Sequence, residues 1–258
     1  MLRAVALAMT LIYLPISLAF AASAHSELWQ QANAAYEMGD YKDAIRAYES
    51  IRAEGLKNGH LYYNLGNAYF KMGESGSAIL NYERARKLLP RNRDVRMNLR
   101  VAQEQLQDET GGAKHSFLGA LAGKYLGLLS VAEARRLEFG LFLVLCLLGV
   151  LWHSRLLSQI WVERLGLPRV VATCAVLWLI ALAGLGGKYL WELQNQGAVV
   201  RAQEMEVRSG PGPDYPLQFQ LHEGYVVQLE GEMRSGWSRV RAREGLEGWA
   251  RSGDLEVI

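Results

Sequence analysis

Histidine, cysteine and paired carboxylates are the residues that would carry catalysis or metal binding, and this 258-residue sequence keeps them apart. The histidines are His25, His60, His115, His153 and His222, and the cysteines are Cys146 and Cys174. No histidine has a second ligand type at metal-site spacing, and no Ser/His/Asp or Cys/His constellation is visible. A glycine-rich stretch that ends at Lys188 lacks the spacing of a phosphate-binding loop. The sequence therefore predicts no catalytic residue, no metal ligand and no cofactor.

The residues with regular spacing are instead aromatic, small and amide side chains. Gly39, Ala44 and Tyr48 recur 34 positions later as Gly73, Ala78 and Tyr82, and Asn33 recurs as Asn67. A fixed period of this length is typical of helical repeats. Small residues let two antiparallel helices approach closely, aromatic residues fill the space beside them, and proline ends the second helix. The spacing therefore indicates an architectural role.

Residues 59 to 92 closely resemble the tetratricopeptide repeat. Its signature positions hold Tyr62, Leu65, Gly66, Tyr69, Ala78, Tyr82, Ala85 and Pro90. Residues 25 to 58 match less well, as terminal repeats often do, and Asp94 to Gln107 is expected to form a capping helix with Asp94 as its N-cap. The resemblance implies an all-α solenoid over residues 25–110. Two and a half repeats are near the lower limit for stability, so we expect support from a partner or the membrane.

The first helices of such an array line a concave face that binds partner segments. The residues predicted there are Trp29, Asn33, Tyr36, Tyr63, Asn67, Phe70 and Lys71. In some members of the repeat family, asparagines at these two positions and nearby lysines clamp a peptide's C-terminal carboxylate. Glu37 stands one repeat before Lys71 and weakens this interpretation. The alternative, which the motif favours, is that both asparagines are ordinary consensus residues.

The first 24 residues have the anatomy of a secretory signal peptide. One basic residue, Arg3, precedes an apolar run from Ala4 to Ala22, and the segment ends in the small residues Ala22-Ser23-Ala24. Cleavage is predicted after Ala24, and an uncleaved N-terminal anchor is the alternative. In both cases residue 25 onward starts on the outer side of a membrane.

Two later apolar stretches predict a transmembrane hairpin. Val170 to Gly187 is an uncharged run long enough to span a bilayer, whereas Phe139 to Trp152 is shorter and is alternatively a core or interfacial helix. We predict spans at residues 137–157 and 170–188, a linker or interfacial segment at 111–136, and a cytoplasmic loop at 158–169. The basic residues around this loop favour the cytoplasmic side. Two crossings would return the C-terminal part to the outside.

From Gly197 the pattern changes to short alternating strands with frequent turn residues, which predicts a small all-β barrel. Residues 197–258 resemble a bacterial SH3 domain: the matching motifs are VRSGPG from Val207, Gly224, GWSRV from Gly236, and GWA from Gly248. The residues assigned to its surface are Tyr215, Tyr225, Trp237 and Trp249, although core or barrel-rim positions are favoured for the two tryptophans. No signature of proline-rich recognition accompanies them.

Charge and cysteine content exclude several classes of protein. The net charge is only +2, which is too balanced for a nucleic-acid binder. Residues 198–258 are acidic, which disfavours binding to an anionic surface. Both cysteines fall in the apolar stretches, so no disulfide framework is expected.

The order of parts resembles the E-type proteins of the Bacteroides aerotolerance (Bat) operon. This resemblance implies an inner-membrane protein with both modules on the periplasmic side. It also implies partners among von Willebrand A-type proteins, a D-type Bat protein and a MoxR-type AAA+ ATPase. We therefore expect a non-enzymatic scaffold. The alternatives are a peptidoglycan-binding protein and a sensor, and the predicted cytoplasmic loop is too short for a signalling domain.

Overall fold

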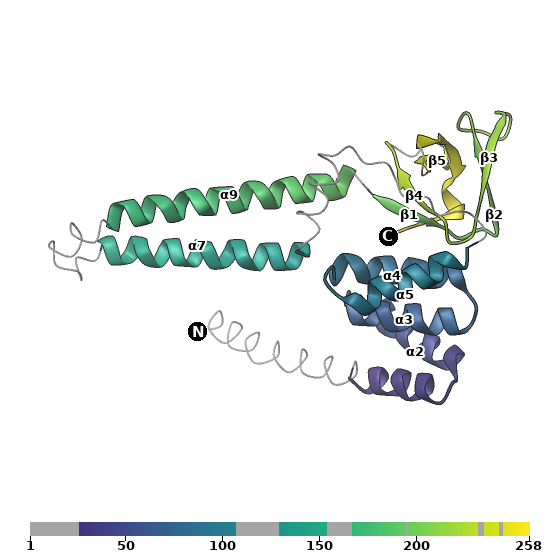
Figure 1. Ribbon diagram of the computed structural model, residues 1–258, viewed down its shortest axis with the longest axis horizontal. Coiled ribbons are helices and arrows are strands. Elements are labelled where there is room, and N and C mark those ends of the chain that lie inside the picture. The colour runs from purple at the N-terminus through teal and green to yellow at the C-terminus, as the bar shows by residue number, and fades with distance from the viewer. Residues whose placement is uncertain (1–25, 107–128, 154–166, 195, 232–234, 243–244) are drawn as a thin grey trace, which may run out of the picture.

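A computed structural model describes residues 26–106, 129–153, 167–194, 196–231, 235–242 and 245–258 (Figure 1). The predicted signal peptide, most of the linker and most of the cytoplasmic loop lie outside these described residues. The described chain forms a helical repeat array, a pair of long helices and a C-terminal antiparallel sheet (Figure 1).

The repeat array is built of short helices joined by tight turns. Beyond a first helix over residues 26–37, it contains α2 (Tyr41–Ala53), α3 (Gly59–Lys71), α4 (Ser75–Leu88) and α5 (Arg93–Glu104). Gly39 and Gly73 have φ angles of 81° and 79° in the turns, a conformation that glycine adopts without strain. A Cβ atom on Gly66 would lie 2.6 Å from the ring of Tyr82. The predicted close approach of paired helices at Gly66 is therefore confirmed.

Asparagine side chains begin two of these helices. Asn58 accepts a hydrogen bond from the backbone N–H of His60 at 2.8 Å, and Asn92 accepts from Asp94 at 2.9 Å and Val95 at 3.1 Å. The prediction of Asp94 as the N-cap of α5 is wrong, because the Asn92 oxygen already satisfies these N–H groups. Asp94 lies in the first turn, where its charge favours the helix N-terminus.

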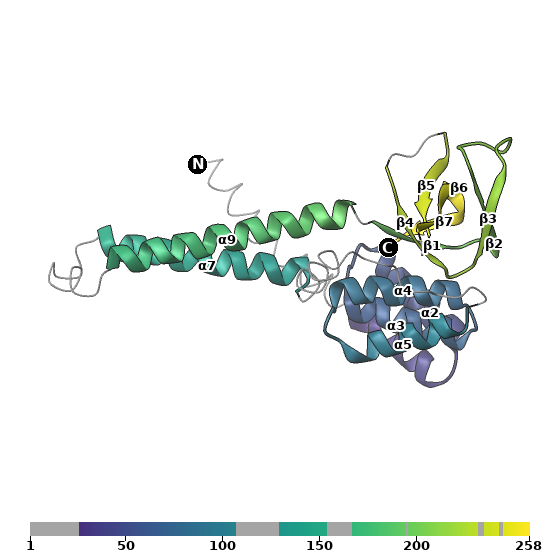
Figure 2. The same cartoon turned by 45° about the horizontal axis from the view of Figure 1, so that its top comes forward.

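The helices α7 (Val131–His153) and α9 (Leu167–Gln194) lie side by side (Figures 1 and 2). Trp178 of α9 donates a hydrogen bond to Glu138 of α7 at 2.8 Å. Among the described residues, one helical segment, Arg169–Glu192, is long and apolar enough to cross a membrane. The described part of α7 does not qualify, because charged residues occupy its first two turns. One membrane-length helix is thus found where two spans were predicted.

Both long helices begin earlier than the apolar runs suggested. α7 starts at Val131 because Ser130 and Glu133 form a capping box: the Glu133 N–H donates to Ser130 Oγ at 3.2 Å, and the Ser130 N–H donates to Glu133 Oε2 at 2.8 Å. Part of the predicted linker is therefore helical. α9 starts at Leu167 with Pro168 in its first turn, a position that proline tolerates.

The C-terminal module is a seven-stranded antiparallel sheet. Its strands are β1 (Gly197–Val200), β2 (Glu204–Arg208), β3 (Leu217–His222), β4 (Val226–Leu229), β5 (Trp237–Arg241), β6 (Glu247–Arg251) and β7 (Leu255–Val257). They pair in the order β3-β2-β6-β5-β4-β1-β7. The pairing gives an open sheet within the described residues, whereas a closed barrel was predicted. The edge strand β7 lies beside α4, whose side chains bind its backbone oxygens.

Candidate partner-binding face

The predicted binding residues lie on the first helices of the repeats. We call this surface the first-helix face: Trp29, Asn33, Tyr36, Tyr63, Asn67, Phe70 and Lys71. Lys71 is exposed and the other six are half-buried. Burial, followed by the nearby phenols of Tyr41 and Tyr63, raises the pKa of Tyr36. The structure thus brings Tyr36 and Tyr63, from successive repeats, into electrostatic reach of each other.

Ring contacts hold several of these aromatic side chains in place. Trp29 meets Tyr48 edge to face at a centroid distance of 6.0 Å, and Tyr36 meets Tyr41 at 5.3 Å. Tyr63 packs at 6.2 Å from Tyr82. Their partners Tyr48, Tyr41 and Tyr82 belong to α2 and α4, the second helices of the two repeats. The second helices therefore pack against the aromatic side chains of the first-helix face.

The two asparagines of the first-helix face make the same hydrogen bonds one repeat apart. Tyr48 Oη donates to Asn33 Oδ1 at 2.5 Å, and Asn64 Nδ2 donates to the same oxygen at 3.4 Å. Each asparagine oxygen therefore binds the tyrosine of its own repeat and the next repeat's asparagine. The equivalent bonds to Asn67 Oδ1 come from Tyr82 Oη at 2.8 Å and Asn98 Nδ2 at 2.9 Å.

We call these hydrogen bonds among Asn33, Asn64, Asn67 and Asn98 and the two tyrosines the asparagine ladder. The ladder gives Asn33 and Asn67 a structural role. Engaging Oδ1 fixes the orientation of each carboxamide and leaves its Nδ2 group as the donor for a ligand. The ladder supports the interpretation as consensus residues, and carboxylate capture by the Nδ2 groups stays a prediction. Asn64 and Asn98 were not predicted as part of the ladder, although they stand 34 positions apart and the repeat period could have found them.

The first-helix face continues onto α5 through two residues that were missed. Met97 and Val101 have 48% and 38% of their surface exposed, so they add apolar contact area on α5. They stand 34 positions after Tyr63 and Asn67, so the repeat period was the signal that could have found them.

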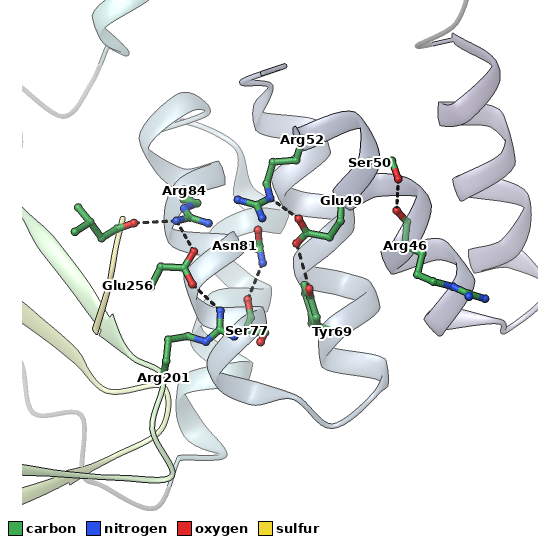
Figure 3. A network of polar contacts seen from close by, with 11 residues as sticks. Arg46, Glu49, Ser50, Arg52, Tyr69, Ser77, Asn81, Arg84, Arg201 and Glu256 are labelled. Carbon is green, nitrogen blue, oxygen red and sulfur yellow. Dashed lines mark hydrogen bonds and ion pairs between the residues drawn. The ribbon is translucent and has the colours of Figure 1, made fainter. Parts of the chain in front are cut away.

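A second polar cluster joins α2 to α3 (Figure 3). Tyr69 Oη donates to Glu49 Oε1 at 3.1 Å, and the other oxygen of Glu49 accepts from Arg52. Burial, followed by the charge of Glu49, raises the pKa of Tyr69 to about 12. Burial also raises the pKa of Tyr82 strongly.

We expect alkaline pH to destabilise the repeat array through Tyr69. An unfolded tyrosine ionises near pH ~10, whereas the pKa of Tyr69 in the folded chain is about 12. The unfolded state therefore loses its proton first, and the stability present below pH ~10 is lost as the pH rises through the folded pKa. Chemical unfolding at about pH 9 and about pH 11 should show a smaller decrease for Tyr69→Phe than for the wild type. Tyr215→Phe, at an exposed position, is the control. Equal decreases for wild type and Tyr69→Phe would contradict the assignment.

On the sheet, the four assigned surface residues separate into two groups. Tyr215 is exposed and Trp249 is half-buried. Tyr225 and Trp237 are buried, so their assignment to the surface is wrong. Tyr225 packs into the sheet core next to β4, and Trp237 lies under the guanidinium of Arg251 at 5.9 Å. The buried position of Trp237 agrees with the core or rim position favoured for the tryptophans.

No described group of three or more His, Cys, Asp or Glu residues could hold a metal ion. Cys146 and Cys174 are free thiols. The first-helix face offers aromatic and apolar contact area beside amide donors and single charges, which are groups used in protein recognition.

Comparison with protein-family models identifies both modules. Residues 30–92 and 63–124 match the tetratricopeptide repeat, and residues 204–256 match the bacterial SH3 domain. The predicted repeats and the predicted SH3-like domain are thereby confirmed. A comparison with characterised proteins finds no match to the chain. The chain therefore combines two modules of the kinds that bind proteins, and in bacteria the second kind also suggests an envelope location.

Proposed function

We propose that this chain is a non-enzymatic scaffold of the bacterial envelope that holds other proteins on its first-helix face. The observation that carries the proposal is the run of half-buried aromatic and exposed apolar side chains across three successive first helices. Tyr36 and Tyr63 lie on the first two of these helices, and Met97 and Val101 continue the surface on α5. Aromatic and methionine side chains are enriched at the cores of protein interfaces.

The long helices support anchoring in the inner membrane. The side chains in the most apolar window of Arg169–Glu192 are not buried within the protein, so lipid would supply their apolar surroundings. Arg91 of the repeat array pairs with Glu133 near the start of α7, and α9 leads into β1, which packs on α4. Both modules thus lie at one end of the helix pair. If α9 crosses the membrane, the chain must cross it a second time for both modules to lie on the same side. α7, which lies beside α9, is positioned to form this second crossing.

Within this proposal, the partners are other envelope proteins and both modules face the periplasm. The order of repeats, membrane helices and SH3-like domain supports a role in a Bat-type stress-tolerance complex. Von Willebrand A-type and D-type Bat proteins are then the expected partners.

The proposal is tested by placing charge on the first-helix face without disturbing its core. Lys71→Glu, Met97→Glu and Val101→Glu alter side chains that are exposed. After cross-linking in cells and purification in detergent, we expect recovery of bound envelope proteins to fall by about tenfold in the triple variant. Leu246→Glu, at an exposed position just before β6, is the matched control. Unchanged recovery from a folded triple variant would rule out this face as the binding site.

Peptidoglycan is the alternative ligand, because residues 204–256 match a bacterial SH3 domain, in which Tyr215 is exposed and Trp249 is half-buried. Under this alternative, the detergent-solubilised full chain should sediment with purified sacculi, and Tyr215→Ala should reduce the pelleted fraction. Sedimentation no greater than that of an unrelated membrane protein would exclude wall binding.

A further inference from the structure

The helix α4 is buried on every side over two turns. All residues from Gly76 to Glu83 are buried, although a helix that packs on one side only buries a stripe. α3 and α5 contact α4 from within the repeat array, and β1 of the sheet contacts it as well (Figures 1 and 2). The side of α4 that the other helices leave open is therefore covered by residues more than a hundred positions later in the chain.

The contact has an apolar centre. Successive residues of a strand point to opposite faces, so Ala198 and Val200 enter the sheet core while Val199 points outward. Val199 is nevertheless fully buried, because it belongs to one cluster with Ile79 and Leu80 of α4. Partly buried side chains from α3, from just beyond α5 and from the sheet pack against this cluster: Tyr63, Tyr69, Phe70, Leu106, Val226 and Ile258.

Two glycines allow the two modules to approach this closely. A Cβ atom on Gly224 would lie 3.4 Å from the Cα atom of Gly76 and 2.6 Å from a methyl carbon of Leu106. A Cβ atom on Gly76 would in turn collide with the side chain of Glu223. The turn before β4 therefore rests directly on the start of α4.

Charged groups surround the apolar centre (Figure 3). Arg84 of α4 donates to Glu256 Oε1 and to the backbone oxygen of Val257, both at 2.9 Å. The second carboxylate oxygen of Glu256 binds Arg201 at 2.6 Å. Lys87 Nζ donates to the backbone oxygen of Ile258 at 2.9 Å. These bonds satisfy backbone oxygens at the edge of the sheet that would otherwise offer a site for strand pairing.

We infer that residues 197–258 are the cap of the repeat array, and that array and sheet unfold as one cooperative unit. A terminal repeat needs a polar outer surface, yet α4 carries Ile79 and Leu80 on the side that the helices leave open. The sheet supplies the missing cover through β1, the turn before β4 and β7. Tyr63 and Phe70 of the first-helix face pack against the same cluster, but the inference concerns how the two modules unfold and does not depend on what that face binds.

Hydrogen exchange of the full chain in detergent tests the inference from the side of the sheet. Val199→Asp places a charge in the buried centre of the contact, and we expect exchange of the α4 amides to accelerate by about 100-fold. Leu217→Asp, at an exposed position on the opposite edge strand, is the matched control and should leave α4 unchanged. The inference would be overturned if the sheet lost its protection from hydrogen exchange while the α4 amides kept theirs. This holds even if Val199→Asp unfolds the sheet completely.

Charge reversal tests it from the side of the array. Arg84→Glu should accelerate exchange in β1 and β7 as well as in α4, and adding Glu256→Arg should restore part of the protection in both modules. Glu247→Arg breaks ion pairs with Arg239 and Arg241 on another part of the sheet and should not affect α4. If the β7 amides exchanged at the same rate in Arg84→Glu and in the wild type, the two modules would fold independently.

Discussion

Ile180→Arg is expected to release most of the protein from the membrane. Ile180 lies near the middle of Arg169–Glu192, with 62% of its surface exposed. An arginine at the centre of a spanning helix costs about 2.5–3.5 kcal/mol on an insertion scale, which lowers the equilibrium constant for insertion about 100-fold. Extraction of membranes with alkaline carbonate measures this fraction.

Tyr189→Arg is the matched control, because Tyr189 is 58% exposed but lies near the end of the same segment, where an arginine reaches the headgroups. An unchanged carbonate-resistant fraction for Ile180→Arg would exclude α9 as a membrane span. Leu147→Arg, at an exposed position in α7, extends the test to the second crossing. A similar loss of insertion would support the hairpin, and a phosphatase fused after Ile258 should then be active outside the cytoplasm.

Tyr82→Ala should be the most damaging single substitution in the repeat array. Tyr82 is 1% exposed, and its ring packs against Gly66. Its Oη group donates a hydrogen bond of 2.8 Å to Asn67 Oδ1. Removing a buried aromatic ring typically costs about 3–5 kcal/mol in the free energy of unfolding. Tyr82→Phe keeps the ring and removes only the bond to Asn67, which should cost about 1 kcal/mol. Urea unfolding of the purified chain measures both values.

The comparison of the two variants separates packing from hydrogen bonding. Tyr215→Ala, which removes an exposed aromatic ring, provides the control and should stay within about 0.5 kcal/mol of the wild type. Equal costs for Tyr82→Phe and Tyr82→Ala would assign the effect to the asparagine ladder alone. If Tyr82→Ala cost less than about 1 kcal/mol, the interpretation of Tyr82 as the centre of helix pairing would be wrong.

The repeat array was predictable because its physics is local and periodic. Gly66, Ala78 and Tyr82 meet within one helix pair, so their spacing in the sequence directly reflects the contact. The start of α5 was misplaced by two residues because Asn92 and Asp94 are both good N-caps, and only the backbone geometry selects one. The capping box at Ser130 and Glu133 follows the S-x-x-E pattern of a helix start, but it lies upstream of the apolar run from which the span was predicted.

The contact between α4 and the sheet was not predictable from the same signals. Val199 and Ile79 are each ordinary core residues for their own module. Neither the 34-residue period of the repeats nor the two-residue period of the strands indicates which apolar residues of one module contact the other module. Glu256 and Arg84 stand 172 positions apart and carry no motif. Tyr225 and Trp237 were misplaced for a related reason, because aromatic residues serve both cores and surfaces.

The short step from α9 to β1 sets how far the binding modules reach. α9 ends at Gln194 and β1 begins at Gly197, and a chain extends by at most about 3.5 Å per residue. With α9 in the bilayer, as proposed, and β1 fixed on α4, the whole assembly would stand on the membrane without a tether. A protein that diffuses in the same bilayer would then meet this surface at a high effective concentration, whereas a freely soluble one would gain nothing from the anchoring. The proposed anchoring would therefore favour cargo that is itself attached to the membrane.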